Sequence, residues 1–353
     1  MVRELRIANT VINDESAAYC IAELGSSGEA DTELTKRFID AAADTGAAAI
    51  KVQKRSNDAR LYTKAMLDQP YLGPNSFGKT YGEHRAALEY SRQQLVELCQ
   101  YTHDKGLHFA ATPFDCASAE MLWEVGVDFL KIASACVTDT VLLDHCARLG
   151  LPIVLSTGTG AQHDVDLAVQ TITQHGCPLA VLQCSATYPC LDPALLHLRV
   201  IETYRQRYPW IVTGLSSHFP QTTDVEAAYV LGGRVFEKHF TLDRRMRGAD
   251  HSFSLEPQAF ANMVNHLETL RIALGSPYKQ RLPEEQAAIT KMGKTLRAAR
   301  MLPAGYVLTR DDIAIRSPGG EGPTPARLAE YIGRTLPEVL AEDEPLPEMR
   351  WYE

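Results

Sequence analysis

The chain has 353 residues, 45% of them apolar, and a formal net charge of −9. This length fits one large domain followed by a small one, and the acidic balance argues against a nucleic-acid-binding protein, which would need a basic surface. The first residues lack the apolar segment of a secretory leader, and no apolar run is long enough to cross a membrane. The eight cysteines form no CxxC pair, so we expect reduced thiols in a cytoplasmic protein.

Short apolar runs alternate with amphipathic segments along most of the chain. The runs cover 19–24, 49–53, 108–114, 129–134, 152–157, 179–184, 211–215 and 234–239. The segments between them have helical period, as does 257–274, and such alternation is typical of βα units. No G-x-G-x-x-G turn follows the first run, which argues against a doubly wound open sheet. The pattern predicts an α/β fold, a (β/α)8 TIM barrel over residues 1–280.

Two stretches depart from this alternation. Residues 55–90 are rich in glycine, proline and aromatic residues and follow the second predicted strand. A long loop there is expected to lie over the C-terminal mouth of the barrel, where ligands bind. After Gly275 the segments become short, and 317–325 is rich in proline and glycine. We therefore expect a linker and a small β-rich domain over 281–353, too small to be strongly stable alone.

Polar side chains recur where the predicted strands end. They are Glu23, Lys51, Gln53, Thr112, Lys131, Ser134, Ser156, Ser185, Ser216, His218, Lys238 and His239. Barrel strands end around one mouth, so these groups are expected to share a binding site. A lysine in an apolar strand is costly unless it meets an anion, so Lys51 and Lys131 are predicted to bind a phosphate and a carboxylate. An ion pair with Glu23, or the Schiff base of an aldolase, are the alternatives.

Two histidines, His218 and His239, end consecutive predicted strands. Two imidazoles at neighbouring strand ends can bind one divalent metal, with water, substrate and a carboxylate such as Glu23 completing an open shell. The alternative is a pair of hydrogen-bonded core histidines. Their position at the mouth favours metal binding.

Several motifs resemble the sialic acid synthase family, the phosphoenolpyruvate-dependent N-acetylneuraminate synthases. These motifs are Ile21-Ala-Glu-Leu-Gly25, Lys51-Val-Gln-Lys54, Ser76-Phe-Gly-Lys-Thr-Tyr-Gly-Glu-His84, Lys131-Ile-Ala-Ser134, Gly214-Leu-Ser-Ser-His218 and Glu237-Lys-His-Phe-Thr-Leu-Asp243. The resemblance implies a TIM barrel followed by a small antifreeze-like (SAF) domain. It also implies a domain-exchanged homodimer, in which the small domain reaches the partner's active site.

The resemblance also implies residue roles. His218 and His239 would hold a divalent metal, manganese or magnesium, and Glu23 and Lys131 would join them as catalytic groups. Phosphoenolpyruvate would be bound by Lys51, Gln53, Thr112, Lys131, Ser134, Ser156, Ser185 and Ser216. The sugar would contact Asn75, Tyr188, Asp250, Arg316 and Cys136. The reaction would be a transferase-type condensation of phosphoenolpyruvate with N-acetylmannosamine or its 6-phosphate, giving a 3-deoxy-2-keto sugar acid and phosphate.

The acceptor side departs from the family pattern. The loop after Gly25 reads Ser26-Ser-Gly-Glu-Ala30 where the family usually has Asn-His, and Cys136 stands where an acidic residue is usual. A different aldehyde acceptor is therefore one alternative, and a barrel that binds ligands without turnover is another. A distal phosphate on the acceptor could meet loop cations, or these could be solvated surface charges. The loop cations are Lys79, Arg85, Arg244, Arg245 and Arg247.

Overall fold

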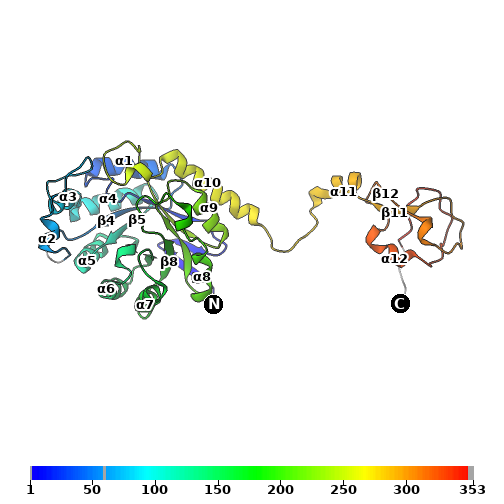
Figure 1. Cartoon of the computed structure of the whole chain (residues 1–353), viewed down its shortest axis with the longest axis horizontal. Helices are drawn as coiled ribbons and strands as arrows, with labels where there is room; N and C mark the ends of the chain where they lie inside the picture. The colour runs from blue at the N-terminus through cyan, green and yellow to red at the C-terminus, as the bar shows by residue number, and fades with distance from the viewer. Residues whose placement is uncertain (1, 59–60, 349–353) are drawn as a thin grey trace. The chain divides into compact units, whose positions relative to one another are not determined.

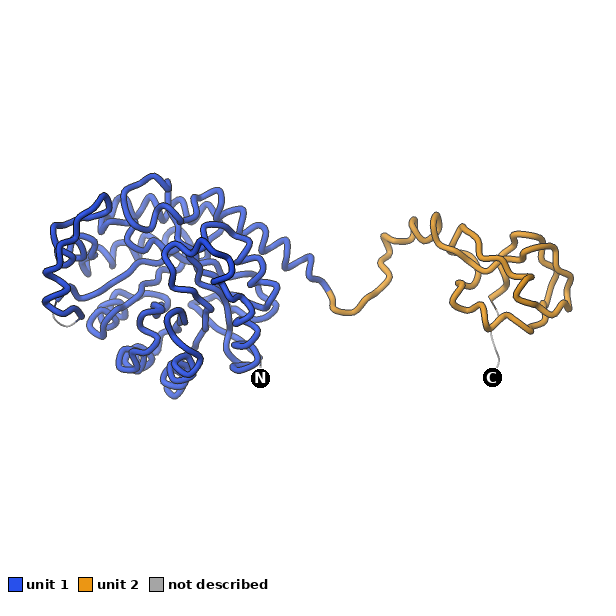
Figure 2. Tube along the Cα trace, in the orientation of Figure 1, with its two compact units in different colours: residues 1–275 blue, residues 276–353 orange. Residues whose placement is uncertain are grey.

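The computed structural model describes residues 2–58 and 61–348. The chain folds into two compact units. Residues 1–275 form the first and residues 276–353 the second, shown in blue and orange in Figure 2. The first unit ends slightly before the predicted boundary at residue 280.

The first unit is a closed barrel of eight parallel strands (Figure 1). The strands are β3 (Tyr19–Glu23), β4 (Ala49–Lys54), β5 (His108–Pro113), β6 (Phe129–Ile132), β7 (Ile153–Ser156), β8 (Leu179–Cys184), β9 (Val212–Ser217) and β10 (Val235–His239). Neighbours in the barrel follow chain order, and β10 closes the ring by pairing with both β3 and β9. The predicted TIM barrel is confirmed.

Helices surround the barrel strands (Figure 1). They are α1 (Thr32–Ala43), α4 (Arg92–Asp104), α5 (Cys116–Val125), α6 (Thr140–Arg148), α7 (Gln162–Thr173), α8 (Val200–Arg207), α9 (Thr223–Val230) and α10 (Pro257–Leu274). Asp31, Ser91 and Asp115 cap the starts of α1, α4 and α5, where each side chain accepts a backbone N–H that has no partner within the helix. Apolar faces such as Phe38 and Ile39 of α1 pack on the outer side of the strands.

An antiparallel hairpin that the sequence analysis did not predict precedes the barrel. It consists of β1 (Glu4–Ile7) and β2 (Thr10–Asn13). Leu5, Ile7 and Ile12 are buried with the first residues of several barrel strands, including Phe129 and Val235. The hairpin therefore covers the bottom of the barrel with apolar side chains.

The insertion after β4 carries two short helices, α2 (Lys64–Leu67) and α3 (Tyr81–Ala87). The second unit contains two short helices, α11 (Gln286–Met292) and α12 (Leu328–Tyr331), and a small apolar core. It also contains two antiparallel strands, β11 (Thr295–Ala298) and β12 (Ile313–Arg316). This agrees with the predicted small β-containing domain. Over residues 2–58 and 61–348, no helix has both the length and the apolar character needed to cross a membrane.

Candidate active site at the mouth of the barrel

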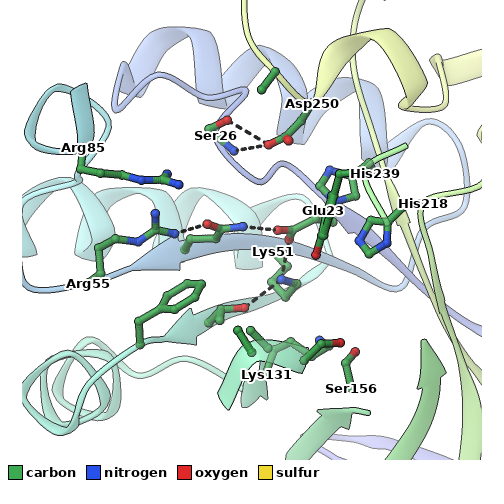
Figure 3. A pocket seen from close by; sticks show the side chains of 18 of the residues that line it. Glu23, Ser26, Lys51, Arg55, Arg85, Lys131, Ser156, His218, His239 and Asp250 are labelled. Carbon is green, nitrogen blue, oxygen red and sulfur yellow. Dashed lines mark hydrogen bonds and ion pairs between the residues drawn. The ribbon is translucent and has the colours of Figure 1, made fainter. Parts of the chain in front are cut away.

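A cavity of about 530 Å³ opens at the C-terminal ends of the barrel strands (Figure 3). Its size suits a small organic ligand or two. Most of the predicted site residues line it, namely Glu23, Lys51, Gln53, Asn75, Thr112, Lys131, Ser134, Ser156, Tyr188, Ser216, His218, His239 and Asp250. The strand ends, the loops that follow them and the insertion thus bring these side chains to one place.

Lys51 is the centre of the polar network at the inner end of the cavity. Its Nζ lies 2.6 Å from Glu23 Oε2 and donates to Thr112 Oγ1 at 2.9 Å. Glu23 also accepts a hydrogen bond from Gln53 Nε2 at 3.0 Å, and Figure 3 shows these contacts as one chain. Lys51, Glu23 and Thr112 are each 2% exposed, so the ion pair is shielded from water.

Glu237 is a functional candidate that the sequence analysis did not assign. Its Oε1 lies 3.7 Å from Lys51 Nζ and 3.6 Å from Lys131 Nζ, so this carboxylate stands between the two lysines. Strand alternation could have identified it, because Glu237 and His239 are two residues apart and share the inner face of β10. The residue between them, Lys238, points to the outer face of the barrel, where its Nζ lies 3.4 Å from Asp224 Oδ2.

The charges at the inner end influence one another strongly. Burial is the largest influence on the pKa of Lys51 and lowers it, but the nearby Glu23 and Glu237 raise that pKa above its ordinary value. Burial lowers the pKa of Lys131, and the charge of Lys51 adds to that effect. Lys131 is held more loosely, since within the described part of the chain its one hydrogen bond is to its neighbour's carbonyl, Ile132 O, at 3.1 Å. Its Nζ is therefore available to an incoming anion.

Hydroxyl groups line the wall beside Lys131. Ser156 Oγ is buried and has no hydrogen-bond partner among the described residues. Ser134 Oγ accepts the Gly158 N–H at 3.0 Å, which fixes its position next to Ser156 on the neighbouring strand end. A buried hydroxyl without a partner is expected where a ligand supplies the missing hydrogen bond.

The two histidines lie together, with ring centroids 5.4 Å apart. His218 Nδ1 donates to the Ser185 carbonyl at 3.1 Å, which leaves its Nε2 as the free lone pair. Burial, reinforced by His239, lowers the pKa of His218 to about 3, so the ring is neutral as metal binding requires. His239 Nδ1 is buried without a hydrogen-bond partner in the described part of the chain.

This donor set fits a divalent metal held by two imidazoles. Within residues 2–58 and 61–348, no group of three or more His, Cys, Asp or Glu side chains is arranged to hold a metal. A metal here would therefore have two protein ligands, and water and substrate would supply the others, as in an open catalytic site.

Asp250 forms the wall between the histidines and the outer part of the cavity. Its Oδ2 accepts hydrogen bonds from the Ser26 N–H at 3.0 Å and from Ser26 Oγ at 2.9 Å. The 26–30 loop, which departs from the family pattern, thus positions Asp250, a residue predicted to contact the sugar. Gly25 permits this arrangement, because it has φ +56° and a Cβ there would lie 2.4 Å from Asp250 Oδ2. Tyr188 covers His218, with ring centroids 3.9 Å apart.

The outer end of the cavity is built largely by the insertion after β4. Its lining includes Arg55, Tyr62, Tyr71, Phe77, Tyr81, His84, Arg85 and Phe114. Of the loop cations proposed to meet a distal phosphate, Arg85 alone lines this cavity. Arg244 donates to backbone carbonyls at Ser254 and Pro220, and Arg245 pairs with Asp243.

Three predicted site residues lie elsewhere. Ser185 is outside the cavity lining, and its carbonyl, rather than its hydroxyl, contacts His218. Cys136 is buried in the apolar core behind the cavity wall, where burial raises the pKa of its thiol to about 11. Cys136 is not among the residues that line the cavity, and its contact with a sugar stays a prediction. Arg316 belongs to the second unit, where it pairs with Asp343, and its role stays a prediction.

The sequence matches two known protein families and several synthases of sugar acids. Residues 38–279 match the NeuB family and residues 294–348 match the SAF domain. The chain is 34% identical to N-acetylneuraminate-9-phosphate synthase of Homo sapiens, covering 96% of this chain and 93% of that protein. It is 29% identical to N,N'-diacetyllegionaminic acid synthase of Campylobacter jejuni, over 92% and 97% of the two chains.

A solved structure shows the same fold. It is the N-acetylneuraminic acid synthetase of Leptospira borgpetersenii in complex with citrate, with a TM-score of 0.72 and 30% sequence identity. The match covers 82% of this chain and 96% of that one. The chain is thus an enzyme of the NeuB family, whose members are transferases that form C–C bonds, and it carries a SAF domain in its second unit.

Proposed function

We propose that this enzyme condenses phosphoenolpyruvate with the open-chain aldehyde of a sugar in a metal-dependent reaction. The products are a 3-deoxy-2-keto sugar acid and inorganic phosphate. The observation that carries this proposal is that a buried lysine pair, with its carboxylates and hydroxyls, and a pair of histidines line one cavity. Candidate acceptors are N-acetylmannosamine, its 6-phosphate and related aldoses, since the relatives are named synthases of different sugar acids.

Phosphoenolpyruvate would bind at the inner end. Lys51 and Lys131, with Thr112, Ser134 and Ser156, offer cationic and hydroxyl donors to its phosphate and carboxylate. Lys131 would turn from Ile132 O to the anion, and Ser156 Oγ would gain the partner it lacks. Phosphoenolpyruvate bound there would present its C3 to the space in front of the histidines.

The acceptor aldehyde would lie between His218, His239 and Asp250. A divalent ion held by the two imidazoles would polarise the aldehyde oxygen as a Lewis acid. As C3 attacks the aldehyde, positive charge develops at C2, and the lysines hold the phosphate and carboxylate of phosphoenolpyruvate in place by electrostatic attraction. Water then adds at C2, and the intermediate expels phosphate. Glu23, which pairs with Lys51 and accepts a hydrogen bond from Gln53, is assigned as the acceptor of that water's proton.

A Schiff-base aldolase is the second candidate, because burial lowers the pKa of Lys131 and so favours its neutral amine. The two reactions differ in their products and in their need for metal. An aldolase would be trapped by borohydride with pyruvate and would survive EDTA, whereas the proposed enzyme would do neither.

The test is phosphate release from phosphoenolpyruvate with Mn²⁺, measured with N-acetylmannosamine, its 6-phosphate, arabinose 5-phosphate and an unacetylated hexose, with and without EDTA. We expect release that depends on an aldose and is abolished by EDTA. A His239→Gln variant should also bind Mn²⁺ more weakly in titration calorimetry, a readout independent of turnover. Release without an acceptor, or activity that survives full metal removal, would contradict the proposal.

Assembly and location are also proposals. We propose a domain-exchanged homodimer in which Arg316 of the second unit contacts the acceptor bound by the partner, and Mn²⁺ or Mg²⁺ as the metal. We also propose a cytoplasmic location, because the eight cysteines form no disulfide among the described residues. Light scattering would test the dimer, and complementation between Arg316→Ala and Lys131→Ala subunits would test the exchange.

A further inference from the structure

The acceptor must extend away from the histidines if its aldehyde is to meet C3 of phosphoenolpyruvate. The opposite side of the cavity carries two guanidinium groups, those of Arg55 and Arg85, which lie next to each other in Figure 3. Phe114, Tyr62 and Tyr81 surround them. The far end of a bound sugar would therefore reach a cationic, aromatic-walled space.

Arg55 is buried with its charge only partly balanced. It is 4% exposed, its guanidinium lies 4.3 Å from the centroid of Phe114, and it donates to Gln53 Oε1. Its Nε lies 3.4 Å from Glu89 Oε1 but makes no hydrogen bond among the described residues. Glu89 also binds Lys54 Nζ at 3.0 Å, so one carboxylate is shared between two cations. A buried cation that shares its carboxylate with another cation is expected where a ligand anion binds.

Arg85 adds a second positive charge to this space. Its Nε donates to Tyr81 OH at 3.0 Å, and no carboxylate in the described part of the chain forms an ion pair with it. Asp250 faces the same space, but its Oδ2 is already bonded to Ser26. Burial is the largest cause that lowers the pKa of Arg55, and the charge of Arg85 is the next, so the two guanidiniums are within electrostatic reach.

We propose that Arg55 and Arg85 form a distal anion subsite that binds a phosphate monoester at the far end of the acceptor sugar. Two guanidinium forks suit a phosphate dianion, whose three oxygens and double charge can meet both groups at once. The inference rests on the proposed function, because the acceptor's orientation follows from it. It selects a phosphorylated aldose among the candidate acceptors and assigns its recognition to the β4 end and the insertion.

Arg85 is the better position for a test, since Arg55 also contacts Gln53 of the inner network. The experiment compares kcat/KM for N-acetylmannosamine 6-phosphate and for N-acetylmannosamine, with phosphoenolpyruvate and Mn²⁺. The wild type is expected to prefer the 6-phosphate. In Arg85→Gln, loss of one charged hydrogen-bonding partner should reduce that preference about tenfold to a hundredfold. Arg55→Lys, which keeps the charge but loses the fork, should reduce it less.

The matched control is Arg245→Gln, which removes the same charge from a side chain that is 90% exposed and paired with Asp243. It should leave the preference unchanged. A wild type without preference for the phosphate, or an Arg85→Gln variant with the wild-type preference, would overturn the subsite while the proposed function stands.

Failure of the proposed function gives a different result. If no aldose supports phosphate release, titration calorimetry of the same two sugars with wild type and Arg85→Gln decides the subsite alone. Binding of the 6-phosphate that weakens about tenfold or more in the variant would support it. Equal binding by both proteins would overturn it.

Discussion

The charged groups at the bottom of the barrel are partnered far more completely than those at its mouth. At the bottom, Asp14 accepts hydrogen bonds from Arg3 at 2.7 Å and from Arg205 at 2.8 Å. Its backbone carbonyl accepts two more from Arg234, at 2.9 and 2.7 Å. These contacts fasten the hairpin region to the barrel and leave no oxygen of Asp14 without a donor.

At the mouth, several buried polar atoms have no partner in the described residues. They are Glu237 Oε2, His239 Nδ1 and Ser156 Oγ. Lys131 Nζ also lies 3.6 Å from Glu237 Oε1, which is longer than a hydrogen bond. Such atoms lower stability unless something satisfies them. The polar network at the bottom of the barrel therefore has its hydrogen bonds made and serves stability. The network at the mouth has atoms without partners, and a ligand can supply the missing hydrogen bonds. Substitutions at the two ends should therefore differ in what they change.

The largest effect is expected from Lys51→Met. The change leaves Glu23 buried without its cation, so the barrel should lose about 3–5 kcal/mol of unfolding free energy. Phosphate release from phosphoenolpyruvate should fall at least about a thousandfold, since an electrostatic donor is lost. Urea unfolding followed by tryptophan fluorescence measures the stability, because Trp123 and Trp210 lie in the barrel unit.

A double variant separates the two losses. Lys51→Met/Glu23→Leu removes both charges and should recover most of the lost stability, while activity stays low. If Lys51→Met alone were as stable as the wild type, the Lys51–Glu23 pair would not be the organising contact of the mouth.

The inner end of this site could be predicted from the sequence, because strands of a barrel alternate and end at one mouth. Alternation places Lys51, Lys131, His218 and His239 at the mouth, where they line the cavity, and the same alternation also indicates Glu237. The position of Cys136 could not be predicted, because a short 3₁₀ turn does not reveal which side chain faces the cavity. Ala135, the residue before it, lines the cavity.

The outer end could not be predicted in the same way. The insertion has no periodicity, so nothing in its sequence shows that Arg85 faces the cavity while Lys79 does not. The N-terminal hairpin was missed for a related reason, since two strands of four residues are too short for alternation to stand out.

A smaller effect is expected at the wall of the mouth, from Gly25→Ala. The new Cβ would lie 2.4 Å from Asp250 Oδ2 and 3.2 Å from His239 Cε1, so the wall must shift. A displacement of that size in a reacting geometry should reduce kcat/KM by about a hundredfold. The positive φ should also cost about 1–2 kcal/mol of stability.

Gly106→Ala is the matched control for that wall. Gly106 has φ +77°, and a Cβ there would meet no atom within 4 Å. It should show a similar loss of stability with wild-type kcat/KM. Equal activity of the two variants would show that the contact between Gly25 and Asp250 does not position the acceptor.

The smallest effect is expected at the bottom, from Asp14→Asn. Burial raises the pKa of Asp14, but the hydrogen bond and charge of Arg205, with the charge of Arg3, lower it below the ordinary 3.8. Its ionised form therefore stabilises the fold above about pH 4, and this contribution disappears as the pH falls through the lowered pKa. Because the side chain is 38% exposed, solvent screening should limit the loss in Asp14→Asn to about 0.5–1 kcal/mol at pH 7. Urea midpoints of the two proteins should converge as the pH approaches 3, while kcat at pH 7 stays equal, because the satisfied end of the barrel lies far from the chemistry. A gap that persists at low pH would mean that the lost hydrogen-bond geometry, rather than the charge, holds the hairpin in place.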